Sequence, residues 1–136
     1  MLVYPMFAMV VLTVVVGVIA LIARIQSVKA GSVKVRSFKL MDADDFPKAV
    51  VQTTRNFNNQ FEIPVLLYVA CVSYLALELQ SPFAVFLAWT FVALRAAHTY
   101  IHITYNHLLH RMIVFWLAIF VVLALWINLI VQMLGR

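Results

Sequence analysis

Residues 55–64 read RNFNNQFEIP and place polar side chains inside an otherwise apolar stretch of the chain. Within this segment, Arg55, Asn59 and Glu62 are spaced i, i+4 and i+7, so on an α-helix all three would project from one face. Ionised groups at membrane depth cost at least a few kcal/mol each unless they are paired or hydrated. The stripe therefore predicts a face turned towards protein, water or a polar ligand. The alternative is an ion-paired stripe that locks helices together.

The composition around this segment is that of a membrane protein. Of the 136 residues, 65% are hydrophobic and 11% are charged, whereas a soluble domain carries about 25% charged residues. We therefore predict an all-α fold, an integral membrane four-helix bundle, that forms one domain over residues 1–136 in a lipid bilayer. The predicted spans are at about residues 2–24, 47–79, 82–105 and 110–134.

Three local signals predict where these helices break. Gly31 follows the first span and should end its helix. Asp44 or Asp45 is expected to cap the second helix, with Pro47 in its first turn. Pro64 comes two residues after Glu62, and because proline lacks a backbone donor we expect a kink beside that carboxylate.

The basic residues predict the orientation of the chain in the membrane. Most of the ten lysines and arginines surround the first connection: Arg24, Lys29, Lys34, Arg36, Lys39, Lys48 and Arg55. Arg95 and Arg111 bracket the connection between the third and fourth spans. Since basic connections stay in the cytoplasm, both termini are predicted on the non-cytoplasmic side, as in a multi-pass protein of a bacterial inner membrane. The net charge of +5 records this orientation, and no nucleic-acid partner is predicted.

A second polar stripe is predicted on the third span. Arg95, His98 and His102 are spaced i, i+3 and i+7, which again defines one helical face. The topology places this stripe at the same depth as the stripe of the second span. Pairing of Glu62 with Arg55 or Arg95 would explain part of the cluster but would leave a surplus of positive groups. A cation-rich pocket that opens to the cytoplasm suits a small anionic ligand.

The same histidines allow a metal-binding interpretation. His98 and His102 have the i, i+4 spacing of two metal ligands on a helix, and Glu62 could be a third. Isolated histidine pairs with this spacing more often bond to backbone or to neighbouring side chains. No metal site is therefore predicted.

The two stripes resemble the motifs of a known family. Arg55-x3-Asn59-x2-Glu62 in a second span is similar to the signature of the MAPEG proteins, the membrane-associated proteins in eicosanoid and glutathione metabolism. Arg95-x2-His98, with Arg111 sixteen residues beyond Arg95, is similar to the second motif of that family. The topology of four spans with a basic first connection also resembles the family.

The resemblance implies a homotrimer of four-helix subunits, with glutathione bound as co-substrate between neighbouring subunits near the cytoplasmic face. The residues assigned to glutathione binding on this basis are Arg55, Asn59, Glu62, Arg95 and His98. His102 is assigned with them because it lies on the same stripe as Arg95 and His98. Arg111 matches the arginine that stabilises the glutathione thiolate and is the predicted catalytic residue. A fixed guanidinium beside a thiol favours the reactive thiolate, in agreement with this role.

The resemblance implies a glutathione-dependent membrane transferase or peroxidase that acts on hydrophobic small molecules, specifically electrophiles that partition into the bilayer. One position departs from the family pattern. The family often has a tyrosine four residues after the histidine of its second motif, where this chain has His102. The alternative is a non-catalytic protein of the same fold that serves as a structural or partner-binding subunit.

Overall fold

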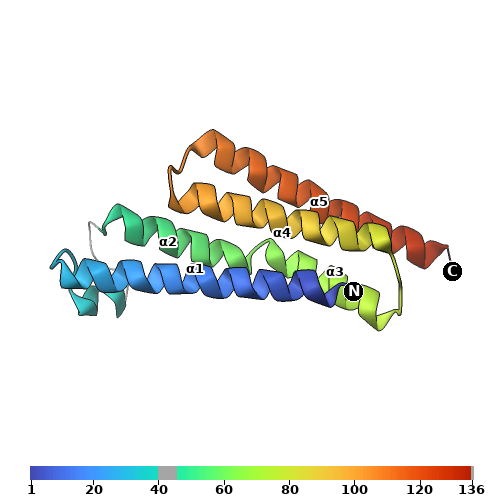
Figure 1. Cartoon of the computed structure of the whole chain (residues 1–136), viewed down its shortest axis with the longest axis horizontal. Helices are drawn as coiled ribbons and strands as arrows, with labels where there is room; N and C mark the ends of the chain where they lie inside the picture. The colour runs from blue at the N-terminus through green and yellow to red at the C-terminus, as the bar shows by residue number, and fades with distance from the viewer. Residues whose placement is uncertain (40–45, 136) are drawn as a thin grey trace.

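The computed structural model describes residues 1–39 and 46–135 and shows long helices lying side by side (Figure 1). In chain order, with η marking a 3-10 helix, the elements are α1 (Val3–Lys29), η1 (Val35–Lys39), α2 (Lys48–Asn58), η2 (Asn59–Phe61), α3 (Pro64–Ala76), α4 (Pro82–Ile103) and α5 (Leu108–Leu134). Within the described residues, four segments are long and apolar enough to cross a membrane, namely α1, residues 48–76, α4 and α5. The chain is therefore a multi-pass integral membrane protein.

The outward faces of these helices are apolar, as contact with lipid requires. In α1 the side chains of Phe7 and Val14 are exposed, and in α5 those of Trp116 and Phe120 are exposed. In α1, α4 and α5 each span is one continuous α-helix, so the backbone polar groups are paired within it, which is the condition for crossing hydrocarbon. The apolar surface and the helical secondary structure are therefore both those of a protein surrounded by lipid.

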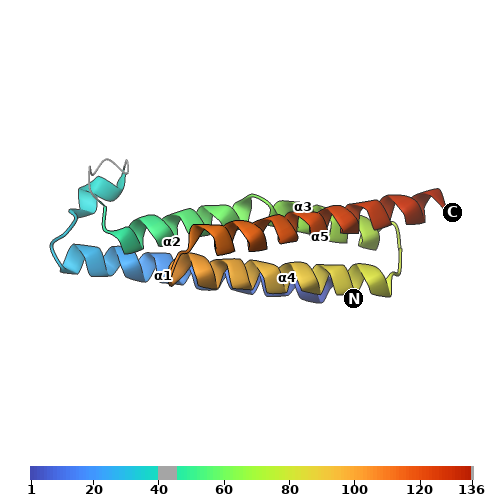
Figure 2. The ribbon, with the colours of Figure 1, turned by 90° about the horizontal axis from the view of Figure 1, so that it is seen from above.

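The connections and termini divide between the two ends of the bundle. Both termini and the α3–α4 connection lie at one end, while the α1–α2 and α4–α5 connections lie at the other (Figure 1 and Figure 2). The two basic connections are therefore on the same side, as the charge pattern requires. The assignment of that side to the cytoplasm stays a prediction.

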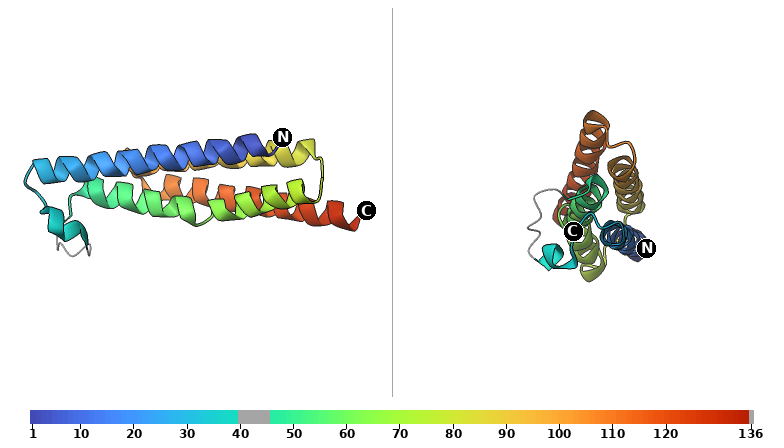
Figure 3. Two further views of the ribbon diagram at one scale, coloured as in Figure 1. Left: turned by 90° about the horizontal axis from the view of Figure 1, so that it is seen from below. Right: turned by 90° about the vertical axis from the view of Figure 1, so that its left-hand side faces the viewer.

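Packing is centred on α4, which contacts α1, α2 and α5, while α5 also packs on α3. The end-on view in Figure 3 shows this four-helix arrangement. The core near the termini is apolar and fully buried, and its members include Met9, Leu67, Ala70, Phe91 and Leu125. The other end of the bundle has a polar interior, which contains the predicted stripes.

The structure agrees in part with the helix ends and the kink that the sequence predicts. The first helix continues past Arg24 to Lys29, and Gly31 follows with φ of 72°. Pro47 is the N-cap of α2, directly before the first helical residue, and its carbonyl accepts from the N–H of Val51 at 3.2 Å. The prediction that Pro47 lies inside the first turn was wrong by one residue. A proline at this position needs no backbone donor, and the helix starts one residue later. Asp44 and Asp45 lie outside the described residues.

The second span is interrupted beside Glu62. The α-helix α2 ends at Asn58, η2 follows, and Glu62 has φ −93° and ψ −99°. Pro64 is the first residue of α3. The expected kink is confirmed, and it divides the span into two shorter helices.

Glu78, just after the end of α3, has a left-handed backbone conformation. It has φ of 53°, and the next amide, of Leu79, donates to the Tyr74 carbonyl at 2.9 Å. A side chain in the left-handed region is strained, whereas glycine is not. We expect Glu78→Gly to raise the free energy of unfolding by up to about 1 kcal/mol.

The measurement is thermal unfolding in mild detergent. Glu78→Gln keeps the β-carbon and should leave the unfolding midpoint close to that of the wild-type protein. A glycine variant that unfolds at a lower temperature than the glutamine variant would show that Glu78 is not strained.

Candidate functional site

The inward face of α4 has a run of buried polar side chains. Arg95 is 0% exposed, His98 2% and His102 3%. Their spacing puts them on one side of the helix, and that side faces the interior of the bundle. The structure therefore buries the whole predicted stripe of the third span.

Arg95 connects this face to the interrupted second span. Its Nη2 donates to the backbone carbonyl of Asn59 at 2.8 Å. That carbonyl lies where α2 gives way to η2, so the regular helical hydrogen-bond ladder is interrupted there. The Nε and Nη1 of Arg95 are buried and have no hydrogen-bond partner among the described residues. Arg95 thus holds the break in place and keeps unused donors inside the bundle.

A cavity of about 210 Å³ lies beside these groups. Its lining residues are Asn59, His98, His102, Arg111, Met112 and Phe115. The His98 ring centroid lies 5.7 Å from that of His102 and 5.9 Å from that of Phe115. The Nδ1 atoms of both histidines are buried and have no hydrogen-bond partner in the part of the chain that the structure describes. The cavity therefore combines a cation, an amide and two imidazoles with an apolar wall.

Arg111 reaches this cavity from the first turn of α5. Its Nη1 donates to Asn106 Oδ1 at 3.0 Å and lies 3.4 Å from His102 Nε2. Both contacts fix the guanidinium against the end of α4. A permanent positive charge consequently forms part of the cavity wall.

Arg55 and Glu62 lie outside this cavity. Both are exposed on the single chain, and Asn59 is half-buried. The interruption of the second span means that the three residues do not share one continuous helix. Among the described residues, Glu62 forms no ion pair with Arg55 or Arg95. The pairing considered from sequence is therefore absent from the described part of this chain.

An uncharged polar cluster next to Arg95 was missed by the sequence analysis. Gln60 Nε2 lies 3.2 Å from Thr99 Oγ1 and 3.4 Å from Asn56 Oδ1. All three residues are buried between α2, η2 and α4. The i, i+4 spacing of Asn56 and Gln60 was a usable signal, although neither residue is charged. The cluster aligns the two spans that form the site.

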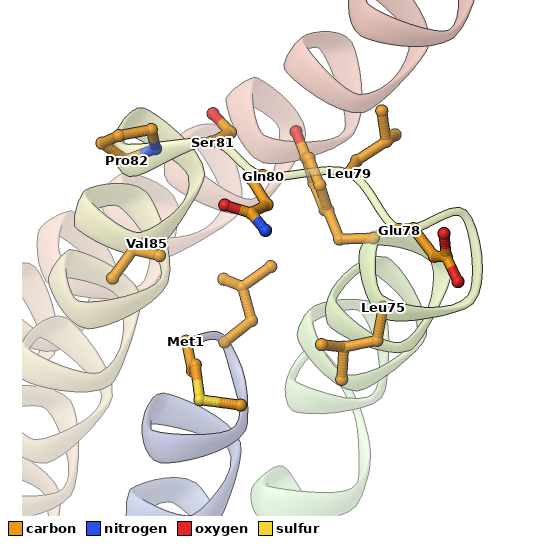
Figure 4. Close-up of a pocket in the computed structure, with 10 residues that line it drawn as sticks. Met1, Leu75, Glu78, Leu79, Gln80, Ser81, Pro82 and Val85 are labelled. Carbon is orange, nitrogen blue, oxygen red and sulfur yellow. The ribbon is translucent and has the colours of Figure 1, made fainter.

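A larger cavity lies at the opposite end of the bundle. Its volume is about 790 Å³, and its lining includes Met1, Leu79 and Pro82. Figure 4 shows Met1 across this cavity from Glu78 and Gln80. None of the predicted site residues borders it, so we assign the functional site to the smaller, polar cavity.

The described residues do not provide a metal site. Within residues 1–39 and 46–135, no group of three or more His, Cys, Asp or Glu side chains is arranged to hold a metal ion. Glu62 therefore does not complete a set of ligands with His98 and His102 in this part of the chain.

Comparison with known proteins gives one match. The model of the MAPEG family matches residues 2–131. No curated protein and no solved structure matches the chain. The family match includes every residue of the two predicted stripes as well as Arg111.

Proposed function

Because the chain belongs to the MAPEG family, we propose that it is a glutathione-dependent membrane transferase or peroxidase that acts on hydrophobic electrophiles. The observation that carries this proposal is the position of Arg111, a fixed cation on the wall of a polar cavity inside a membrane-spanning bundle. The electrophile would enter from the bilayer, and glutathione from the polar end of the bundle.

The chemistry that Arg111 supports is ionisation of a thiol. A cysteine-type thiol has a pKa of about 8.5 and is mostly protonated at neutral pH. A guanidinium beside the sulfur stabilises the thiolate, and the proton passes to solvent. In the transferase reaction, the thiolate attacks the electrophilic carbon and a carbon–sulfur bond forms. The leaving group departs with the electron pair of the broken bond.

Binding of glutathione uses the other polar groups. Glutathione has two carboxylates and one ammonium, so it requires both cations and an anion. Arg95, with its unused donors, is assigned to a carboxylate and Glu62 to the ammonium, although neither residue lines the cavity of the single chain. Asn59, His98 and His102 add neutral polar contacts along the cavity.

The exposure of Arg55 and Glu62 supports assembly as a homotrimer with glutathione between subunits. Both residues are exposed although they lie within a membrane-spanning segment. Charged side chains in such segments face protein or a polar cavity and avoid hydrocarbon. A neighbouring subunit that covers this face would turn the exposed charges into the second wall of the site.

Two carboxylates provide a matched test of glutathione binding. Glu62 is exposed beside the break in the second span, and Glu78 is exposed at the other end of the bundle. Glu62→Gln should weaken glutathione binding about tenfold, which corresponds to the loss of about 1.4 kcal/mol of charge interaction. Glu78→Gln should leave the affinity unchanged. Titration calorimetry in detergent measures both.

The results separate ligand binding from a structural role. A Glu62→Gln protein that loses its oligomeric state, while the folded fraction still binds glutathione normally, would assign Glu62 to the subunit interface alone. Small and equal effects of both substitutions would show that the stripe is not the ligand site.

The alternative function is that of a non-catalytic subunit. His102, at a position where the family often has tyrosine, is the observation that favours it. Such a protein would lack thiolate stabilisation, which the Arg111 variants described in the Discussion measure directly.

A further inference from the structure

The connection between α4 and α5 brings a neutral amide against Arg111. Asn106 has φ of 48°, and its backbone N–H donates to the Ile101 carbonyl at 2.8 Å. Its side-chain Oδ1 accepts from Arg111 Nη1 at 3.0 Å. We propose that Asn106 is a positioning residue that holds the Arg111 guanidinium against the cavity, an inference that rests on the proposed glutathione chemistry.

The backbone of Asn106 explains why its side chain is a reliable anchor. Asparagine is one of the few residues that adopt the left-handed region readily. Its hydrogen bond to Ile101 ties it to the last buried turn of α4. The Oδ1 atom therefore moves with α4, although the arginine that it holds belongs to α5. Asn106 thus fixes Arg111 relative to the helix that supplies the histidines of the site.

The second partner of Arg111 is weaker. His102 Nε2 lies 3.4 Å from Arg111 Nη1, and this atom can accept only in one tautomer. The shorter contact to Asn106 has no such condition. Asn106 is therefore the main side chain that sets the direction of the guanidinium.

The chemical nature of the anchor also matters. An amide oxygen accepts a hydrogen bond without neutralising the arginine, so the positive charge stays available to a thiolate. A carboxylate at the same position would bind the guanidinium more strongly and would compensate its charge. If Asn106 only anchored Arg111, aspartate would anchor it more firmly and activity would be kept or raised. If Asn106 positions an uncompensated charge for the thiolate, aspartate would lower activity.

The test compares two substitutions of Asn106 in the full-length protein in detergent. Asn106→Gly keeps the left-handed backbone and removes the amide, while Asn106→Asp keeps an acceptor and adds a negative charge. Glu78→Gly is the matched control, because it removes a side chain from a second non-glycine left-handed position, at the far end of the bundle. The readouts are glutathione affinity, thiolate absorbance in the ultraviolet, and the pH profile of kcat/KM with a chloronitrobenzene electrophile.

Positioning predicts that Asn106→Gly lowers kcat/KM about tenfold near neutral pH and moves the profile to higher pH. Asn106→Asp should move the profile at least as far, while Glu78→Gly should keep the wild-type kcat/KM and pH profile. His98 and His102 share the cavity wall with Arg111, and neither is altered in these variants. A shift common to both Asn106 variants therefore reports on the arginine.

The outcomes that contradict the inference are distinct from those that contradict the function. Wild-type protein that ionises glutathione, together with an Asn106→Gly variant that ionises it equally well, would overturn the positioning role alone. An aspartate variant that exceeds the wild-type rate would also overturn it. Wild-type protein that neither binds nor ionises glutathione would overturn both the inference and the proposed function.

Discussion

Replacing Arg111 with alanine is expected to leave glutathione affinity within a few fold of wild type while turnover near neutral pH falls roughly tenfold or more. The reason is electrostatic. Losing about 1.4 to 3 kcal/mol of favourable interaction with a thiolate raises the pKa of the thiol by roughly one to two units. The rate should partly recover at higher pH, where thiolate forms without help. Ultraviolet difference absorbance of the bound thiolate and steady-state rates measure the two effects separately.

Two further substitutions define the role of the charge. Arg111→Lys should be intermediate, since lysine keeps the charge but lacks the planar guanidinium whose Nη1 contacts both Asn106 and His102. Arg36→Ala is the matched control, because Arg36 is an exposed basic residue of η1, in the basic α1–α2 connection. If Arg111→Ala kept wild-type thiolate absorbance and rate, Arg111 would serve membrane orientation only. The non-catalytic alternative would then be the better description.

The meeting of the two polar stripes could be predicted from the sequence. The spacing within each stripe placed it on one helical face, and the charge pattern placed both stripes at one depth. The hydrogen bond from Arg95 to the Asn59 carbonyl confirms that the two spans meet at these residues. This prediction succeeded because helical periodicity and the basic connections are both strong signals in a membrane protein.

The direction of each side chain in the second span could not be predicted in the same way. The i, i+4, i+7 pattern assumed a continuous helix, but the span is interrupted between Asn58 and Pro64. The proline signalled a kink without giving the rotation that leaves Glu62 exposed. The rotation of the chain between α2 and α3 depends on tertiary contacts. Here these are the contacts of Arg95 with Asn59 and of Gln60 with Thr99, which the spacing of residues in the sequence does not reveal.

The apolar half of the bundle has a polar contact that sequence patterns also could not reveal. Asn128 Oδ1 accepts from the Tyr74 hydroxyl at 2.6 Å, from Ser81 Oγ at 3.2 Å and from Gln132 Nε2 at 3.1 Å. The first two donors lie about fifty residues away in the chain, so no local spacing predicts them. One amide thereby joins α5 to the end of α3 and the start of α4.

Asn128→Leu is expected to be among the most destabilising single substitutions in this protein. It would leave the hydroxyls of Tyr74 and Ser81 without this acceptor, and Tyr74 is 0% exposed. Each orphaned buried group costs about 1–3 kcal/mol, so the free energy of unfolding should fall by roughly 2–4 kcal/mol. Unfolding by sodium dodecyl sulfate from mild detergent micelles measures this change.

A double substitution separates the hydrogen bond from general packing. Tyr74→Phe alone removes one donor and should cost about 0.6–1.7 kcal/mol, the range found for hydrogen bonds between membrane helices. In the Asn128→Leu protein the Tyr74 hydroxyl already has no acceptor there, so removing it should cost little or restore some stability. The two effects should therefore be strongly non-additive. Additive costs would mean that Asn128 acts through its shape, and that the polar contact contributes little to holding α5 against α3.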